Sequence, residues 1–305
     1  MTPRKVDWVV PDWNKETELP DEIKKVMYDL YIQNGSSDVY SYDAFFDLDL
    51  KDVISALEIQ NKRIDVKLIV DSDNYYQIEN ISVEVKQDFR SPFMHNKFCI
   101  IDGVKFSSGS LNPTDNGAYE NNNNLLFGYS KTLALNYEDE FHEMWNGVFG
   151  KGANVENPIV YLEGIKVENY FCPEDDCADK VIRTLKKAES SIYFMTFSFT
   201  HGGIGNVLLM KNLEGVLVKG VFENRGSGSE YSKFNIFDFQ GISVVKDKNP
   251  ANMHHKVFII DNSIVITGSF NPSANADERN DENILIIYDK ELANEYIEEF
   301  KRLSS

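Results

Sequence analysis

The sequence contains the same set of polar residues twice. Both stretches follow one template: His, any residue, Lys, four residues, Asp, six residues, Gly-Ser, any residue, Asn. They occupy residues 95–112 and 254–271, and every member recurs at an offset of 159 (254 − 95 = 159). A spacing kept through two copies is a strong motif, because chance would have to produce it twice. The members are His95, Lys97, Asp102, Gly109, Ser110 and Asn112, then His254, Lys256, Asp261, Gly268, Ser269 and Asn271.

Apolar runs on both sides of the central aspartate predict that each stretch is a β-hairpin. The Asp-Gly pair at 102–103 is a strong signal for a two-residue turn. Such a turn places His95 opposite Ser110, with their Cβ atoms about 5 Å apart. Lys97, two residues along the strand, shares the face of His95. We therefore expect each hairpin to gather its own histidine, lysine and serine on one patch, with the asparagine just beyond it.

The aspartates and glycines of the motif are interpreted as structural. Asp102 and Asp261 each follow their histidine by seven residues, an odd step that takes them off the patch. Their place between two apolar runs is typical of turn residues. Gly109 and Gly268 complete this structural part of the motif.

The remaining side chains suit a phosphate. Each patch offers an imidazole, an ammonium, a hydroxyl and an amide, and two facing patches would offer each of them twice. Ammonium and amide donors bind charged oxygens. One imidazole can attack phosphorus while the other protonates the leaving oxygen. The motif contains no acidic pair and no ligand cluster, so it predicts no metal site. The sequence thus predicts P–O bond cleavage at one active site built from both copies.

The paired stretches resemble the HKD motifs of the phospholipase D superfamily, which contains phospholipases, cardiolipin synthases and hydrolases, and metal-independent nucleases. The resemblance implies an α/β fold of two α/β/α repeats, with mixed sheets flanked by helices, pseudo-two-fold symmetry and an active site at their interface. It also implies a covalent phosphohistidine intermediate and no cofactor. By analogy His95 is the nucleophile, and His254 is the acid that later becomes the base.

The family also places an acidic residue after the motif to orient a histidine. Glu282 occupies that position, whereas its counterpart in the first copy is Asn123 (282 − 159 = 123). One carboxylate for two histidines should make the histidines inequivalent. The candidate catalytic residues are His95, Lys97, Asn112, His254, Lys256, Asn271 and Glu282. The candidate substrate contacts are Ser110, Ser269 and His201, which follows a predicted core strand.

Hydrophobic periodicity predicts that the elements of the first half recur in the second. The expected boundaries are a leader at 1–18, repeats at 19–150 and 159–305, and a Gly- and Asn-rich linker at 151–158. Strands are expected at 39–46, 66–70, 81–85, 125–129, 191–200, 215–223, 242–245 and 284–287. Helices are expected at 21–33, 50–60, 133–149, 176–187, 204–213 and 290–303.

Composition limits the partners and the compartment. The 305 residues carry a net charge of −18 (31 − 49), which weakens any expectation of tight salt-driven binding to polyanions. No stretch has the length of a transmembrane span, and residues 1–30 contain no signal-peptide core. We expect a soluble protein of unassigned location, with a mature exported form left open. Cys99 is expected in the core, while Cys172 and Cys177 either form a local disulfide or remain thiols.

Three functions fit these observations. A nuclease-like phosphodiesterase is preferred, because the motif is compact and no lipid-binding segment is evident. A phospholipase or phosphatidyl transferase would use the same catalytic residues, and exposed aromatic residues beside the cleft would favour it. A non-catalytic binding protein would hold the two histidine patches too far apart to share a phosphate. The expected partner is a phosphodiester substrate, either nucleic acid or phospholipid, bound by a monomer that is an internal pseudo-dimer with no obligate protein partner.

Overall fold

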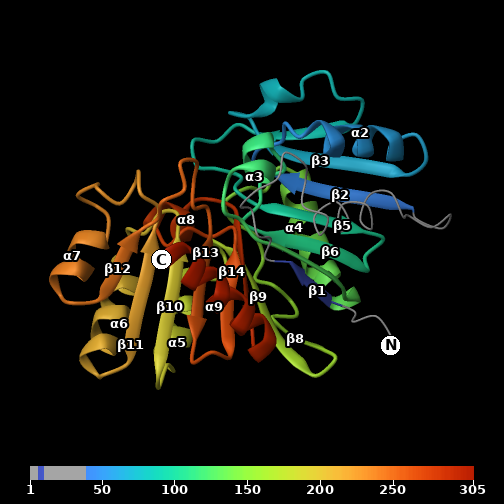
Figure 1. Ribbon diagram of the computed structural model, residues 1–305. Coiled ribbons are helices and arrows are strands. Elements are labelled where there is room, and N and C mark those ends of the chain that lie inside the picture. The colour runs from blue at the N-terminus through green and yellow to red at the C-terminus, as the bar shows by residue number, and fades with distance from the viewer. Residues whose placement is uncertain (1–5, 10–38) are drawn as a thin grey trace.

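A computed structural model describes residues 6–9 and 39–305 of the chain. Two β-sheets lie side by side in it, each flanked by helices (Figure 1). The strands of the first sheet are β1 (Val6–Val9), β2 (Tyr40–Phe45), β3 (Asp65–Asp71), β4 (Glu84–Asp88), β5 (Lys97–Ile101), β6 (Lys105–Gly109) and β7 (Leu125–Tyr129). Those of the second are β8 (Ile159–Leu162), β9 (Ile165–Cys172), β10 (Ser191–Thr196), β11 (Leu217–Phe222), β12 (Ser243–Lys246), β13 (Lys256–Ile260), β14 (Ile264–Gly268) and β15 (Glu282–Ile287).

In the described part of the chain the two sheets have the same topology, except that the second has an additional edge strand, β8. The first has the order β1-β7-β6-β5-β2-β3-β4, and the second, read from its β8 edge, has β8-β9-β15-β14-β13-β10-β11-β12. Both sheets are mixed: β2 is parallel to β3 and antiparallel to β5, and β10 is parallel to β11 and antiparallel to β13. The described helices are α2 (Lys51–Gln60), α3 (Asp115–Tyr119), α4 (Lys131–Trp145), α5 (Cys177–Leu185), α6 (Gly202–Leu213), α7 (Phe234–Phe239), α8 (Ala274–Glu278) and α9 (Lys290–Ser304), with a 3-10 turn at Tyr75–Gln77. The predicted α/β class with two repeats is confirmed.

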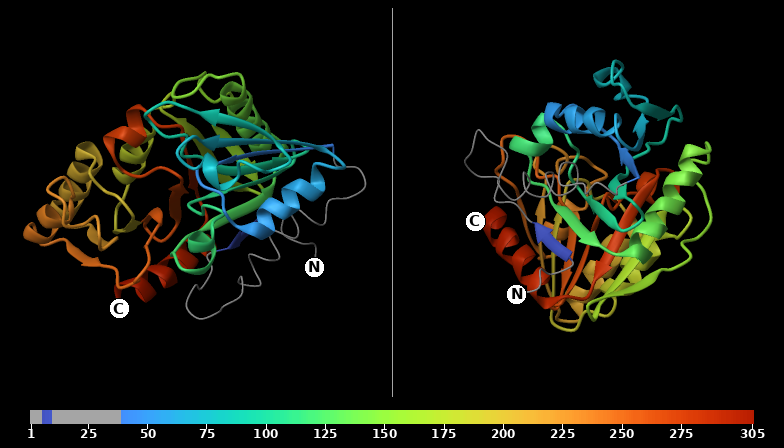
Figure 2. Two further views of the ribbon diagram at one scale, coloured as in Figure 1. Left: turned by 90° about the horizontal axis from the view of Figure 1, so that it is seen from above. Right: turned by 90° about the vertical axis from the view of Figure 1, so that its right-hand side faces the viewer.

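The closing helices of the repeats, α4 and α9, join the two halves. Both begin and end at equivalent positions (290 − 131 = 159; 304 − 145 = 159). Their buried faces, which include Tyr137 and Tyr296, belong to one apolar cluster with side chains from both sheets. The other helices cover the opposite sheet faces, where each half has a separate core. Two further views show the halves meeting along a broad boundary (Figure 2). Because the central core is shared, neither repeat buries its apolar surface alone.

The prediction of an irregular leader is wrong for Val6–Val9. These residues form β1, which pairs antiparallel with β7 as β9 pairs with β15. The rest of 1–18 and the helix expected at 21–33 lie outside the described residues. The strand expected at 81–85 lies instead at Glu84–Asp88, and the strand expected at 191–200 ends at Thr196.

The hairpin turns are longer than predicted by one residue. Ile101 pairs with Lys105 and Ile260 pairs with Ile264, so each loop contains three residues. The reason lies in the motif aspartate, which has a positive φ (54° at Asp102) and turns its carboxylate away from the hairpin. Its Oδ1 accepts hydrogen bonds from the backbone N–H groups of Val39 and Tyr40, at the start of β2. A one-residue change of register reverses which side chains share a face.

Asp261 has the same structural task in the second half. Its φ is 49°, and its carboxylate accepts the backbone N–H groups of Glu189, Ser190 and Ser191, at the start of β10. These hydrogen bonds join each hairpin to the neighbouring strand of its sheet. Both aspartates therefore have turn positions far from the histidine rings, as the sequence predicts.

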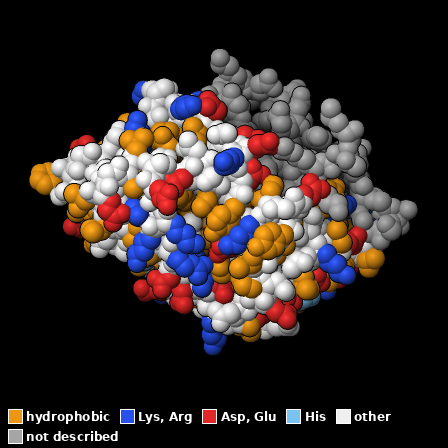
Figure 3. Space-filling view, turned by 90° about the horizontal axis from the view of Figure 1, so that it is seen from below, with side chains coloured by type: hydrophobic (Ala, Val, Ile, Leu, Met, Phe, Trp, Pro, Cys, Tyr) orange, Lys and Arg blue, Asp and Glu red, His pale blue; other side chains and the backbone are white. Residues whose placement is uncertain are grey.

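Three features of the described chain bear on membranes and redox state. Cys172 and Cys177 form a disulfide, and Cys99 is buried within β5. Among the described helices, none combines the length and the apolar character needed to cross a bilayer. Seen from below, one face gathers Lys and Arg side chains beside hydrophobic ones (Figure 3).

Candidate active site

Each motif histidine is anchored by backbone of the other half. The N–H of His95 donates to the carbonyl oxygen of Asp281 at 2.9 Å. The N–H of His254 donates to the carbonyl oxygen of Asn122 at 2.8 Å. Asp281 directly precedes β15, and Asn122 lies just before β7, so the two connections cross the boundary between repeats in opposite directions. The site thus forms where the halves interlock.

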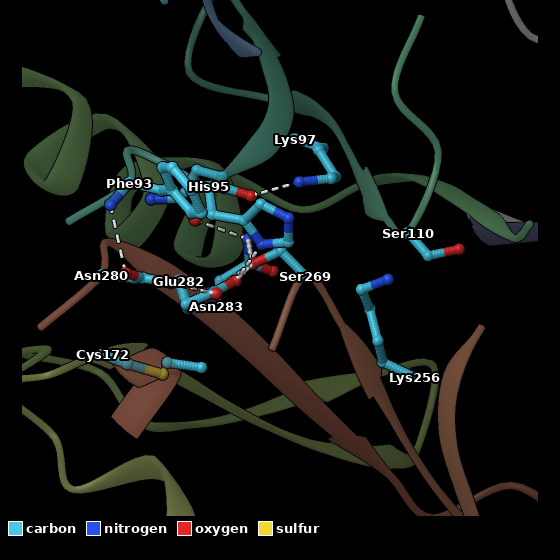
Figure 4. A network of polar contacts seen from close by, with 12 residues as sticks. Phe93, His95, Lys97, Ser110, Cys172, Lys256, Ser269, Asn280, Glu282 and Asn283 are labelled. Carbon is cyan, nitrogen blue, oxygen red and sulfur yellow. Dashed lines mark hydrogen bonds and ion pairs between the residues drawn. The ribbon is translucent and has the colours of Figure 1, made fainter. Parts of the chain in front are cut away.

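The side chain of His95 pairs with the carboxylate of the second half. Its Nδ1 lies 2.7 Å from Oε2 of Glu282, which also accepts the hydroxyl proton of Ser269 at 2.7 Å. The other oxygen of Glu282 accepts from Nδ2 of Asn280 at 3.2 Å. Figure 4 shows these side chains converging beneath the imidazole ring. With Nδ1 held in this contact, the ring keeps Nε2 for chemistry.

His254 has an amide where His95 has a carboxylate. Its Nδ1 lies 2.9 Å from Oδ1 of Asn123 and 3.1 Å from the carbonyl oxygen of Ser110. The hydroxyl of Ser110 donates to the same Oδ1 at 3.1 Å, and Nδ2 of Asn123 donates to the carbonyl oxygen of Gly117. The two histidines therefore have the same geometry but differ in their partner, an ionisable carboxyl group at His95 and a neutral amide at His254, which is the inequivalence that the sequence predicts.

The serines serve the opposite histidine from the one predicted. Ser110 lies beneath His254 and Ser269 beneath His95, because the longer turns shift the hairpin register. Both side chains are fully buried. Each hydroxyl also accepts a backbone N–H, from Asn124 at Ser110 and from Asn283 at Ser269. Each hydroxyl thus donates and accepts within the protein and positions Asn123 or Glu282, while its contact with substrate stays a prediction.

The motif glycines allow each hairpin to approach the next strand closely. Gly109 has a φ of 152° and Gly268 a φ of 146°. A Cβ atom at Gly109 would clash with the carbonyl oxygen of Asn124, and one at Gly268 with that of Asn283. Any larger residue at either position would push apart the two strands that hold the serine beside its partner.

The two lysines reach the site from opposite halves (Figure 4). Nζ of Lys97 donates to the carbonyl oxygen of His95 at 2.5 Å, and Nζ of Lys256 to that of His254 at 2.7 Å. Each ammonium also lies over a phenylalanine ring, Phe46 at 5.1 Å or Phe197 at 5.0 Å from the centroid. Both lysines are 2% exposed. Two buried cations held so close to two imidazoles form a site for an anion.

The same phenylalanines pack edge-on against the histidines. Phe46 lies 4.9 Å from the ring of His95, and Phe197 lies 4.8 Å from that of His254. Each ring thus fixes both the lysine and the histidine of its half. Sequence reasoning missed this role, although Phe46 and Phe197 occupy equivalent places directly after β2 and β10. The sequence feature that could have indicated this role is a phenylalanine directly after the equivalent strand in both copies.

Burial and the paired lysines control protonation. Burial, together with Lys97 and Lys256, holds the pKa of His95 well below its usual value, and the same causes act on His254. Burial lowers the pKa of Lys97 to about 7 and that of Lys256 well below its usual range. Burial raises the pKa of Glu282 to about 8, although Lys97 and Ser269 oppose the rise. The resting histidines are therefore unprotonated bases, and an entering anion would raise the pKa of each cation.

The remaining predicted residues divide into two groups. Asn112 and Asn271 are partly buried, and each has a buried Oδ1 without a hydrogen-bond partner. His201 does not join the two motif histidines. It is the N-cap of α6, where Nδ1 accepts the N–H of Ile204, and its Nε2 lies 3.7 Å from Asp277. Capping explains the position of His201 after β10.

Buried amides connect the halves beneath the site, and they were not predicted as site residues. Nδ2 of Asn283 donates to Oδ1 of Asn96, while the hydroxyl of Ser108 donates to Oδ1 of Asn283. Asn124 is the equivalent of Asn283 and contacts Nδ1 of His255 at 3.2 Å. The signal was the duplicated tetrad at 121–124 and 280–283, which ends in asparagine in both copies.

A comparison with family models identifies the lineage of this fold. The family described as "Cardiolipin synthase, PLD-like domain" matches residues 31–145 and 181–304, one match in each repeat. The chain belongs to the phospholipase D superfamily. It is a phosphodiesterase of that superfamily, with two HKD motifs in a single polypeptide.

Curated relatives align with about half of this phospholipase D superfamily chain. The phospholipase D of Rickettsia conorii is 37% identical over 140 residues, which cover 46% of this chain and 70% of that protein. The mitochondrial cardiolipin hydrolase of Xenopus tropicalis is 30% identical over 151 residues, covering 48% of this chain and 72% of that protein. The phosphatidylserine synthase structure from Haemophilus influenzae covers 98% of this chain and 86% of its own at 13% identity, with a TM-score of 0.72, and shares the fold.

The lowered pKa of Lys97 predicts pH-dependent anion binding by this phospholipase D superfamily member. Below about pH 7 the lysine carries its proton in the empty site, and above this pH it must take up a proton to bind an anion. Sulfate affinity, measured by calorimetry between about pH 6 and pH 9, should therefore fall about tenfold per pH unit above neutrality. Lys97→Met should bind sulfate more weakly and with a flatter slope. An affinity independent of pH in the unmodified protein would contradict this charge assignment.

Proposed function

We propose that this protein is a phospholipid phosphodiesterase that works through a covalent phosphohistidine. The observation that carries the proposal is the crossed pair of histidines, His95 on Glu282 and His254 on Asn123, with both lysines near enough to act on both imidazoles. A phosphate bound by the lysines would have one imidazole on either side. Imidazole, ammonium and amide groups supply the base, the acid and the charge stabilisation, so the proposed reaction needs no catalytic metal.

In the first step Nε2 of His95 attacks phosphorus, and the bond from phosphorus to the leaving oxygen breaks. His254 gives that oxygen its proton. The anionic substrate raises the pKa of His254, which allows a residue that is unprotonated in the empty site to act as an acid. Glu282 balances the positive charge that develops on His95.

In the second step a water molecule attacks the phosphohistidine. His254 accepts the proton of the water, the P–N bond breaks, and His95 is released as a neutral base. Lys97 and Lys256 bind the phosphoryl oxygens throughout both steps. Asn112 and Asn271, each with an unpaired amide oxygen, are proposed to bind the substrate at the edge of the site.

Exposed aromatic residues support phospholipid over nucleic acid as the proposed substrate, which reverses the order favoured by the sequence. Phe93 is 39% exposed two residues before His95, and its ring packs on Phe46, the ring that contacts His95. An apolar rim beside the catalytic histidine suits contact with acyl chains or a bilayer surface. The named functions of the curated relatives, phospholipase D and cardiolipin hydrolase, support the same order.

A second support is a cavity of about 340 Å³ beside the other histidine, lined by residues that follow β10 and β11. Phe197, which contacts His254, is part of this lining, together with Ser198, Glu223 and Arg225. The mixture of an aromatic ring, a hydroxyl and both charges suits a polar headgroup. We place the leaving group of the substrate there, within reach of His254.

The test offers the purified protein phospholipid vesicles, single-stranded DNA, RNA and a soluble chromogenic phosphodiester, all in the presence of a chelator and well below the melting temperature. We expect turnover of phospholipid and of the chromogenic diester because both fit a metal-independent histidine mechanism. Turnover of nucleic acid alone would restore the nuclease hypothesis. Activity that appears only with added metal would overturn the mechanism.

The variant that tests the lipid assignment is Phe93→Ser. It removes the exposed ring but keeps the backbone N–H that donates to Asn280. Its kcat/KM on vesicles should fall about 30-fold, because burial of a phenylalanine contributes about 2 kcal/mol. Its activity on the soluble diester should not change. Phe239→Ser removes an exposed ring on α7 and should alter neither activity.

A further inference from the structure

Three carboxylates gather where α4 lies beside the segment that connects the repeats. Glu140, Glu143 and Glu174 each place an oxygen within 4.8 Å of the others. Glu140 is buried at 6% exposure. Glu174 lies in the loop that the Cys172–Cys177 disulfide closes. Burial raises the pKa of Glu140 well above its usual value, and Glu174, Asp281 and Glu143 add to the rise.

The second repeat has a buried glutamate at the equivalent position, and its partners can be compared with those of Glu140. Glu299 is the equivalent of Glu140 in α9 (299 − 159 = 140), and it is also 6% exposed. Its carboxylate binds Nε2 of His255 at 3.0 Å and the guanidinium of Arg302 at 2.7 and 2.6 Å. These two partners hold the pKa of Glu299 below its usual value.

Both partners are replaced in the first half. The equivalent of His255 is Asn96, and the equivalent of Arg302 is Glu143 (302 − 159 = 143). A neutral amide and a further carboxylate thus stand where the second half has an imidazole and a guanidinium. The two helices match residue by residue from end to end, so the comparison is between equivalent sites. The first half lacks positive charge at the place where its duplicate supplies it.

An unpaired oxygen and an open space accompany the carboxylates. Asn136 lies one helical turn before Glu140 on the same face of α4. It is 1% exposed, and its Oδ1 has no hydrogen-bond partner, while its Nδ2 donates to Asn157 and Asn169. Asn136, Glu140 and Glu143 line one cavity of about 450 Å³, whose other wall includes residues 153–156 of the connecting segment.

We propose that this cavity binds a calcium ion. Carboxylate and amide oxygens are the ligands that calcium prefers, at 2.3–2.6 Å. Oxygens up to 4.8 Å apart can reach one ion at about 2.4 Å, since opposite ligands are separated by twice that distance. The cation takes the place that the guanidinium of Arg302 has in the second half. It ties α4 of the first repeat to the connecting segment and to Glu174 of the second.

The test is thermal unfolding of the whole protein without substrate, in chelator and with added calcium. At a calcium concentration 100 times Kd, the melting temperature of the unmodified protein should rise by about 4 °C. Magnesium should shift it less, because that ion demands near-ideal octahedral geometry at shorter distances. An equal shift with both ions would indicate general screening of charge and overturn the proposal.

The variants are chosen by comparison with the equivalent residues of the second repeat. Glu143→Arg copies Arg302, so in chelator it should melt higher than the unmodified protein and should show no calcium shift. Glu140→Gln should also lose the shift, with calcium affinity by calorimetry at least about tenfold weaker. Glu278→Gln, an exposed change on α8, should keep the full shift. A calcium shift that persists in Glu143→Arg, or its absence from the unmodified protein, would overturn the proposal. Neither result depends on the proposed lipid substrate.

Discussion

His95→Asn and His254→Asn should each lower kcat by about 10⁴-fold, but they should stop the reaction at different steps. His95→Asn removes the nucleophile, so no covalent adduct should form. His254→Asn removes the acid and the base. With a chromogenic diester, whose leaving oxygen needs no proton, the first step should still occur in His254→Asn and the phosphohistidine should accumulate because water is no longer activated.

Mass spectrometry of the intact protein and of its peptides measures this difference. The expected result is an acid-labile adduct on His95 in His254→Asn. His142→Asn, an exposed change on α4, should leave kcat within a few-fold of its starting value. An adduct on His254 in His95→Asn would exchange the two roles. If neither variant forms an adduct although the unmodified protein turns over the same diester, the covalent mechanism is wrong.

Glu282→Gln should lower kcat by about 100-fold with a smaller change in KM. The substitution keeps an oxygen that can accept from Nδ1 of His95, but it removes the negative charge that balances phosphohistidine formation. The loss should therefore appear in the rate of the first step, measured as the burst of chromogenic product. Circular dichroism and the melting temperature should show that the variant is folded.

Asn123→Asp is the matched control, because it places a carboxylate beside His254 in the geometry that Glu282 has beside His95. The double variant Glu282→Gln/Asn123→Asp again has one carboxylate–histidine pair, now on the other histidine. We expect that it does not regain the burst rate, since the charge is beside the wrong residue. Full recovery would show that the two histidines are interchangeable and would remove the basis for naming His95 the nucleophile.

The sequence predicted the topology of the site better than its contacts. The constant offset between the motifs indicated two repeats with a shared active site, and Glu282 was placed beside a histidine. The crossed pairing of Ser110 with His254 and of Ser269 with His95 was not foreseen. It depends on whether a turn contains two residues or three, and the side chain of Asp102 decides that by binding a strand about 60 residues away. A local turn signal carries no information about such a partner.

Other misses have similar causes. The strand Val6–Val9 is short, and it is defined by its pairing with β7, not by its own composition. Helices α3 and α8 have only five residues each and little apolar periodicity; Thr114 and Ser273 start them by capping. The role of His201 as the cap of α6 was also not foreseen, while its contact with substrate stays a prediction. In each case a tertiary or capping interaction determines the local structure, and a short stretch of sequence does not contain that information.

The bond between His95 and Glu282 also governs when the protein can become active during its synthesis. The two residues are separated by 187 positions. When only the first repeat has been synthesised, His95 has no Glu282 to pair with. The first sheet also lacks the side chains that the second repeat contributes to the shared core. Hydrolytic capacity should therefore appear abruptly, once β15 and α9 have left the exit tunnel. Prematurely terminated chains that lack Glu282 should therefore have no phosphodiesterase activity.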